Sequence, residues 1–115
     1  MDLKNTKGIK KDSDFRKVYK HGKSFANKYL VMYILNNKSD FNRVGFSVSK
    51  KVGKANIRNK VKRRIRESFR LNCDEYIETG YDLVFIARIA SKDTNYNDIE
   101  KSVINLVKKS KLLKY

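Results

Sequence analysis

Hydrophobic residues recur every four positions between residues 50 and 70, in the most regular pattern of the chain. The repeating residues are Ile57, Val61, Ile65 and Phe69. On an α-helix this spacing forms one apolar stripe. The opposite side is polar and largely basic, with Asn59, Arg63, Arg66 and Arg70 on the face and Lys62 and Arg64 on its flanks. The pattern therefore predicts an amphipathic helix that is capped by Asn56 and ends near Leu71 or Asn72.

Three further apolar segments, residues 29–35, 43–49 and 81–89, have the composition of β-strands. In the second segment Val44, Phe46 and Val48 alternate with polar or small residues, so the two sets face opposite sides of a sheet. The polar turn at residues 36–42 favours an antiparallel pair between the first two strands. The third segment is the most apolar, and we expect it near the centre of the sheet.

The long helix lies between the second and third strands, which predicts a βαβ crossover with those two strands parallel. A shorter helix is expected from a cap at Asp12 or Ser13 to about Lys20, followed by Gly22. A last helix is expected after a cap at Asn95 or Asn97, with the apolar stripe Ile99, Val103, Leu106 and Val107.

These elements predict a single α+β domain over residues 1–115, in the order α-β-β-α-β-α, with a mixed sheet. We also consider an extra short strand near residues 23–28. Residues 1–10 offer little to a core and carry Lys4, Lys7 and Lys10. We therefore expect this segment to be a mobile basic arm.

The charge of the chain points to a polyanionic partner. The formal net charge is +16. Ten of the residues from 50 to 70 are Lys or Arg and only Glu67 is acidic, so the helix repels itself unless a partner supplies negative charge. Five of the eight Arg residues lie in this helix, and Arg offers the planar fork that suits phosphate. The alternative interpretation is a solvated basic face.

The sequence argues against catalysis by the protein itself. It has one His and one Cys, no zinc-type spacing and no clustered carboxylates, so we predict no catalytic residue and no metal ligand. No apolar run is long enough to span a membrane, and no secretory signal is evident. The lone Cys73 suits a reducing compartment, where its default interpretation is a buried thiol. We expect a cytoplasmic binding protein.

The basic helix also resembles a known signature. Ala55, Arg58, Asn59, Val61, Lys62, Arg63, Ile65 and Arg66 match the Arg-Asn-Arg motif of the bacterial ribonuclease P protein component family, with Lys60 in place of the third Arg. Lys keeps the charge at that position and loses the bidentate geometry. The resemblance extends upstream through residues 14–22 and 44–51 and covers most of the chain.

The resemblance implies two RNA-binding surfaces. The helix would hold the catalytic RNA subunit of ribonuclease P, through Lys54, Arg58, Asn59, Lys60, Lys62, Arg63, Arg66 and Arg70. A cleft would hold the single-stranded 5′ leader of precursor tRNA, through Phe15, Arg16, Tyr19, Tyr33, Arg43, Ser47, Ser49 and Lys51. Removal of the leader would then be hydrolysis catalysed by RNA, with Mg²⁺ bound mainly by the RNA subunit and the substrate.

Several alternatives stay open from the residues alone. Phe15 and Tyr19 have the spacing of core residues, and the strand face with Arg43, Ser47 and Ser49 has the composition of a solvated face. For the whole protein the main alternative is a ribosomal-type or RNA-chaperone protein with no processing role. A DNA-compacting protein and an autonomous nuclease are further alternatives.

Overall fold

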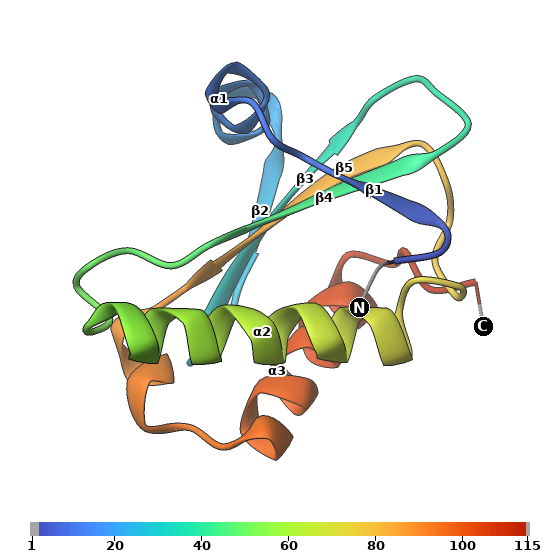
Figure 1. The fold of residues 1–115 in the computed structure, drawn as a ribbon. Helices are drawn as coiled ribbons and strands as arrows, with labels where there is room; N and C mark the ends of the chain where they lie inside the picture. The colour runs from blue at the N-terminus through green and yellow to red at the C-terminus, as the bar shows by residue number, and fades with distance from the viewer. Residues whose placement is uncertain (1–2, 115) are drawn as a thin grey trace.

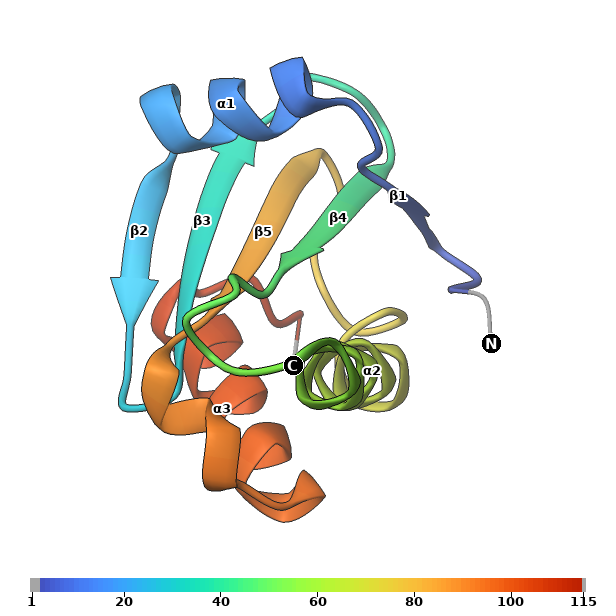
Figure 2. The same cartoon turned by 60° about the vertical axis from the view of Figure 1, so that its left-hand side comes forward.

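The computed structural model describes residues 3–114, which form one five-stranded sheet with helices on both sides (Figure 1). Helix α1 lies against one face, and helices α2 and α3 cover the other (Figures 1 and 2). The elements in chain order are β1 Thr6–Gly8, α1 Asp12–His21, β2 Lys23–Ala26, β3 Leu30–Asn36, β4 Asn42–Ser47, α2 Ala55–Asn72, β5 Tyr81–Ala87, the 3₁₀ helix η1 Ile89–Asp93 and α3 Tyr96–Lys109. The α+β class and the mixed sheet are confirmed.

The strand order is β1-β4-β5-β3-β2. Strands β4 and β5 are parallel and β5 is central, as predicted. The predicted antiparallel pair of β3 with β4 is wrong, because β5 lies between them and pairs with both. The turn that follows β3 passes the start of β5 and is hydrogen-bonded there. The Asn37 N–H donates to the Gly80 carbonyl at 2.8 Å, and the Asn37 side chain donates to Asp82 at 2.9 Å.

The N-terminal segment is not a separate basic arm. Strand β1 pairs in parallel with β4, and Ile9 is buried. The Lys4 and Asn5 N–H groups donate to the buried carboxylate of Asp74 at 3.0 and 3.1 Å. These partners lie far away in sequence, so the local composition of residues 1–10 gave no sign of them. The first two residues of the predicted arm lie outside the described residues.

The caps predicted for α1 and α2 are wrong. Lys11 precedes α1 and Lys54 precedes α2, and neither makes a side-chain capping bond. Asp12 and Asn56 therefore lie inside the first turns. Asp12 stabilises α1 there through the helix dipole rather than as a cap. Asn95 does cap α3, in a reciprocal capping box with Asp98. The predicted end of α2 at Asn72 and the short strand near residues 23–28 are confirmed.

The main core lies between the sheet and helices α2 and α3. Val61, Ile65 and Phe69 of the predicted stripe are buried, and Ile57 is half-buried at its start. The rings of Phe46 and Phe85 stack with centroids 6.0 Å apart, and both meet the Phe69 ring edge-on. A smaller cluster around Ile9, Val18 and Val84 joins α1 to the other face. The stripe of α2 therefore packs inward and leaves its basic side outward.

Candidate nucleic-acid interface

Aromatic side chains gather where the short helix α1 meets the sheet. Phe15, Tyr19 and Tyr33 are half-buried beside the small cluster under α1. The ring centroids of Phe15 and Tyr19 lie 6.3 Å apart, and those of Tyr19 and Tyr33 lie 5.3 Å apart. The interpretations as core and as cleft each hold in part, because every ring packs on one side and keeps exposed surface on the other.

The strand register explains why these three rings meet. Tyr33, Val84 and Gly45 are paired across β3, β5 and β4, so their side chains share the face under α1. Gly45 presents no side chain there: a Cβ at this position would lie 2.5 Å from the Phe15 ring. Glycine thus allows Phe15 to lie directly on β4.

Ser47 lies two residues further along β4 on the same face, beside Tyr19. Burial raises the pKa of Tyr19, while a side-chain hydrogen bond with Ser47 acts in the opposite direction and the nearby Tyr33 raises it further. A hollow of about 320 Å³ opens here, lined by Asp12, Phe15, Arg16, Tyr19, Phe46 and Ser47. We call this hollow the aromatic hollow.

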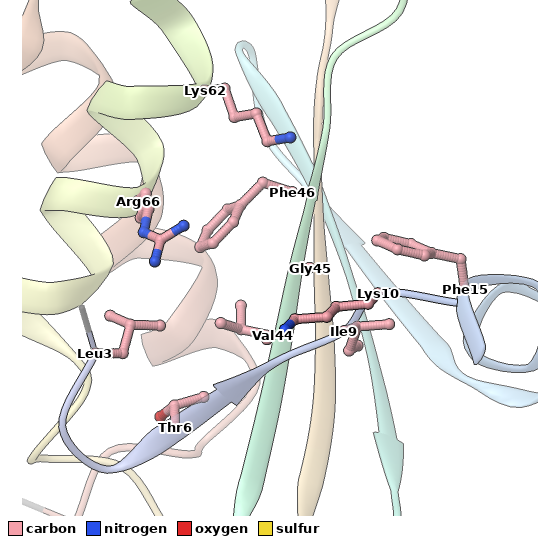
Figure 3. A pocket seen from close by; sticks show the side chains of 11 residues that line it. Leu3, Thr6, Ile9, Lys10, Phe15, Val44, Gly45, Phe46, Lys62 and Arg66 are labelled. Atoms are coloured by element: carbon pink, nitrogen blue, oxygen red, sulfur yellow. The ribbon is translucent and has the colours of Figure 1, made fainter. Parts of the chain in front are cut away.

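A larger cavity of about 590 Å³ adjoins the aromatic hollow and shares Phe15 and Phe46 with it. It reaches from α1 across β1 and β4 to α2, and we call it the bridging cavity. Figure 3 shows Lys62 and Arg66 of α2 on one side of the strands and Phe15 on the other. The full lining is Leu3, Thr6, Gly8, Ile9, Lys10, Phe15, Val44, Gly45, Phe46, Lys62 and Arg66. The two surfaces predicted for RNA are therefore neighbours.

Most of the predicted phosphate-binding residues of α2 point outward. The exposed members are Lys54, Asn59, Lys60, Lys62, Arg63 and Arg66. Arg58 is half-buried, and its Nε atom is buried without a hydrogen-bond partner among the described residues. The exposed guanidinium and ammonium groups form a continuous cationic helix face that suits the phosphates of a folded RNA.

Two basic side chains of α2 are held within the protein. The Nε atom of Arg70 donates to Glu67 at 3.1 Å, and this hydrogen bond raises the pKa of Arg70 and lowers that of Glu67. Arg64 donates to the Thr94 carbonyl at 2.7 Å. The spacing of Glu67 and Arg70, one turn apart, is a sequence signal that could have separated Arg70 from the exposed set.

Arg43 was predicted to bind the leader, and the structure places its guanidinium against carboxylates. Its Nε and Nη2 atoms donate to Asp82 at 2.9 and 2.6 Å, and Nη1 donates to Asp14 at 3.3 Å. The hydrogen bonds with Asp82 raise the pKa of Arg43. Burial acts to raise the pKa of Asp82, but hydrogen bonds from Arg43 and Asn37 hold it below its ordinary value. Arg43 therefore joins β4, β5 and α1.

The other predicted leader residues separate into two groups. Arg16 is exposed and lines the aromatic hollow with Tyr19 and Ser47. Ser49 and Lys51 are exposed in the loop between β4 and α2, outside both cavities. Sequence analysis missed Lys10, Gly45 and Phe46 as cavity residues. No local pattern marks them, because the cavity exists only once β1 and α1 fold against β4.

The structure also bears on metal ligands, on membrane spans and on the one thiol. Within residues 3–114, no three His, Cys, Asp or Glu side chains lie close enough to hold an ion together. No helix of that part of the chain is both long and apolar enough to cross a membrane.

Cys73 is buried, and this burial raises the pKa of its thiol to about 12, with a smaller contribution from the charge of Asp74. The thiol is thus a core group.

Comparison with known proteins relates the whole chain to one family. Residues 3–111 match the family model described as Ribonuclease P. The ribonuclease P protein component of Clostridioides difficile is 70% identical over 110 residues, which are 96% of each chain. That of Alkaliphilus oremlandii is 51% identical over 96% of each chain.

Solved structures agree with this result. The RNase P protein of Staphylococcus aureus is 42% identical with a TM-score of 0.86, over 93% of this chain and 97% of that one. The RNase P protein of Thermotoga maritima is 34% identical with a TM-score of 0.80, over 90% and 96%. Because sequence and fold agree over nearly the whole length, the chain belongs to the family of bacterial ribonuclease P proteins.

Proposed function

We propose that this chain is the protein subunit of ribonuclease P and that it contacts two RNAs at once. The outer face of α2 binds the catalytic RNA subunit. The cleft between α1 and β4 binds the 5′ leader of precursor tRNA. The observation that carries this proposal is the bridging cavity, in which Phe15 of the cleft and Lys62 and Arg66 of α2 line one continuous space.

The leader side of this proposal depends on unpaired bases. The exposed surfaces of Phe15, Tyr19 and Tyr33 offer stacking partners, and stacking of a base on an aromatic ring contributes about 1–3 kcal/mol. A single strand can present its bases to these rings, whereas a duplex keeps them paired and stacked. The cleft therefore favours a single-stranded leader over mature tRNA.

The cationic side acts through charge. Two RNAs that approach each other repel through their phosphates, and the protein brings a formal net charge of +16 to their junction. Each phosphate neutralised by Lys or Arg releases bound counterions and strengthens association. The protein thus lowers the cation concentration that the RNA subunit needs in order to hold precursor tRNA.

Hydrolysis is assigned to the RNA subunit. Within residues 3–114 no three carboxylate, His or Cys side chains lie close enough to hold an ion together, and a cationic helix face repels a divalent cation. Our proposal accordingly has Mg²⁺ bound mainly by the RNA subunit and the substrate, with the assembly working in the cytoplasm. The side chains of this protein bind and orient the leader.

The test is reconstitution with the ribonuclease P RNA of the same organism. Purified protein, RNA subunit and precursor tRNA are combined at low Mg²⁺, and release of the leader is followed on a gel. We expect cleavage with protein and RNA together, and none with either alone. Leader removal by RNA-free protein would contradict the assignment of catalysis to RNA. Equal binding of precursor and mature tRNA by the assembled enzyme would favour a general RNA chaperone.

A further inference from the structure

A buried carboxylate anchors the N-terminal segment, residues 3–10, from a position far away in sequence. Asp74 follows the end of α2 and is only 4% exposed. Its Oδ2 atom accepts hydrogen bonds from the backbone N–H groups of Lys4 and Asn5 at 3.0 and 3.1 Å. Hydrogen bonds to a charged acceptor are stronger than those between neutral groups. Since both donors belong to the backbone, a change of the Lys4 side chain leaves these two bonds in place.

The anchored segment forms one wall of the bridging cavity. The lining residues that belong to this segment are Leu3, Thr6, Gly8, Ile9 and Lys10. Thr6 and Ile9 are buried, and the Ile9 N–H donates to the Val44 carbonyl at 2.9 Å. The bonds to Asp74 at one end and this bond to β4 at the other fix the course of the segment. The wall of the cavity therefore depends on the anchor.

Lys10 brings a positive charge from this wall into the cavity. In Figure 3 its side chain extends along the strands toward the side on which Lys62 of α2 lies, and both residues line the cavity. Lys7 is different, because it lies between two lining residues of β1 and successive side chains of a strand face opposite sides. Its ammonium group lies 4.2 Å from the centroid of the Phe41 ring. Lys10 thus shares a space with α2, and Lys7 does not.

We propose that Asp74 is a positioning residue for binding of the RNA subunit: it holds the N-terminal segment so that Lys10 and Lys62 bind one phosphate of that RNA from two elements. The inference rests on the proposed function and adds the N-terminal segment to the site on α2. Two cations that face one cavity repel each other, and a phosphate between them removes that repulsion. The segment has no acidic residue of its own, so a carboxylate elsewhere in the chain has to hold it beside a basic helix.

The proposal predicts an effect opposite in sign to that of net charge alone. Removal of a carboxylate makes the protein more cationic and by itself strengthens its attraction to RNA. Asp74→Ala also removes the acceptor for the N-terminal segment. We therefore expect this variant to bind the RNA subunit about three- to tenfold more weakly than wild type, the share of one phosphate contact. Asp74→Asn removes the same charge but keeps a side-chain oxygen that accepts a backbone N–H, and it should bind as tightly as wild type or more tightly.

The experiment measures affinity for the RNA subunit over a series of salt concentrations. Lys10→Ala should make the slope of log affinity against log salt shallower by about 0.7–0.9. Asp74→Ala combined with Lys10→Ala should bind no more weakly than Asp74→Ala, because the released segment no longer presents Lys10 to the cavity. Lys7→Ala is the matched control: it removes the same charge from the same segment outside the cavity, and it should change the slope less. Hydrogen exchange tests the anchor directly, since Asp74→Ala should expose the amides of Lys4 and Asn5 while those within α2 stay protected.

The outcomes distinguish this inference from the proposed function. A folded Asp74→Ala protein that binds the RNA subunit as tightly as wild type would overturn the inference. So would equal slopes for Lys10→Ala and Lys7→Ala, or an Asp74→Asn protein that binds as weakly as Asp74→Ala. If Asp74→Ala does not fold, a loss of affinity in Asp74→Asn or the equality of the two lysine variants overturns it. Failure of the wild-type protein to bind the RNA subunit would instead overturn the proposed function.

Discussion

The ring of Phe15 lies directly over Gly45, so that a Cβ added at Gly45 would come within 2.5 Å of Phe15 Cε1. This close approach places the Phe15 ring against β4. It also joins the aromatic hollow to the bridging cavity, because both are lined by this ring. The geometry of the aromatic hollow thus depends on a glycine, which has no side chain to displace the Phe15 ring.

Gly45→Ala should displace the Phe15 ring and narrow the cleft. We expect a stability loss of about 1–2 kcal/mol, typical of overpacking, and weaker binding of precursor tRNA by the assembled enzyme. Gly8→Ala is the control for stability alone, because nothing lies within 4 Å of a Cβ at Gly8 on neighbouring β1 but Gly8 also lines the bridging cavity. Urea titrations measure the stability of both variants, and tRNA affinities are measured for Gly45→Ala and wild type. If Gly45→Ala binds precursor tRNA like wild type, the ring position is unimportant for the leader.

Tyr19→Ala and Tyr33→Ala should act mainly on leader binding. Because both rings are half-buried, we expect less than the roughly 3–5 kcal/mol that truncation of a buried aromatic costs in stability. Affinity of the assembled enzyme for precursor tRNA should fall by about 1–3 kcal/mol per lost stack, and affinity for mature tRNA should hold. Thermal melts and both affinities are the measurements. A large drop in melting temperature, or equally weakened binding of both tRNA forms, would show that these residues serve the core instead of the leader.

Arg63→Ala with Arg66→Ala should weaken binding to the RNA subunit without unfolding the protein. Both side chains are exposed and the apolar stripe of α2 is untouched. The slope of log affinity against log salt should become shallower by about 0.7–0.9 per lost phosphate contact. Arg64→Ala is the control, since Arg64 bonds Thr94: it should lower the melting temperature and change the slope little. An unchanged affinity in the double variant would place the RNA subunit on another face.

Arg43→Ala should destabilise the fold rather than act on the leader specifically. It removes the cationic partner of Asp82, whose side chain is only 3% exposed, and leaves the Asn37 amide as a side-chain donor. We expect a stability loss of about 2 kcal/mol or more for a buried charge without its counter-charge. The pKa of Asp82 is held below its ordinary value of 3.8. The pair therefore stabilises the native state above about pH 4 and loses this contribution as pH falls through the lowered pKa.

Urea titrations between pH 3 and pH 7 check the Arg43 prediction. Wild-type stability should fall more steeply at the acid end than that of Arg43→Ala, and exposed Arg16→Ala should follow wild type. A stable Arg43→Ala that binds precursor tRNA poorly would show that Arg43 contacts the leader after all.

Cys73 should make the protein sensitive to alkali. Its thiol has a pKa of about 12 against an ordinary value of 9.0, so its contribution to stability is complete below pH 9 and is lost as pH rises toward 12. Wild type should lose stability over this window more steeply than Cys73→Ala, which starts lower because a buried group is removed. Denaturation series from pH 8 to pH 11 measure both slopes. Rapid reaction of the native thiol with a disulfide reagent at pH 8 would contradict the buried assignment.

The sequence by itself determined the local elements and the chemical identity of the RNA-binding helix. The four-residue period of Ile57, Val61, Ile65 and Phe69 placed the buried side of α2 correctly, because a helix repeats over short distances along the chain. Local patterns also predicted β4 with its two faces, and they limited the cap of α3 to Asn95 or Asn97, of which Asn95 is the one the structure uses. The signature around Arg58 and Asn59 indicated the family, because its residues are close neighbours along the chain.

Only the tertiary structure decided where these elements meet. The order β4-β5-β3, the docking of β1 and the bond between Arg43 and Asp82 all join residues far apart in sequence. Such contacts depend on which strands pair in the sheet and on which carboxylate lies near a basic side chain. Neither produces a periodic pattern along the chain. Phe15 and Tyr19 illustrate the division. Their spacing predicted a shared face, but only the packing of α1 on Gly45 and Tyr33 left that face half open as a cleft.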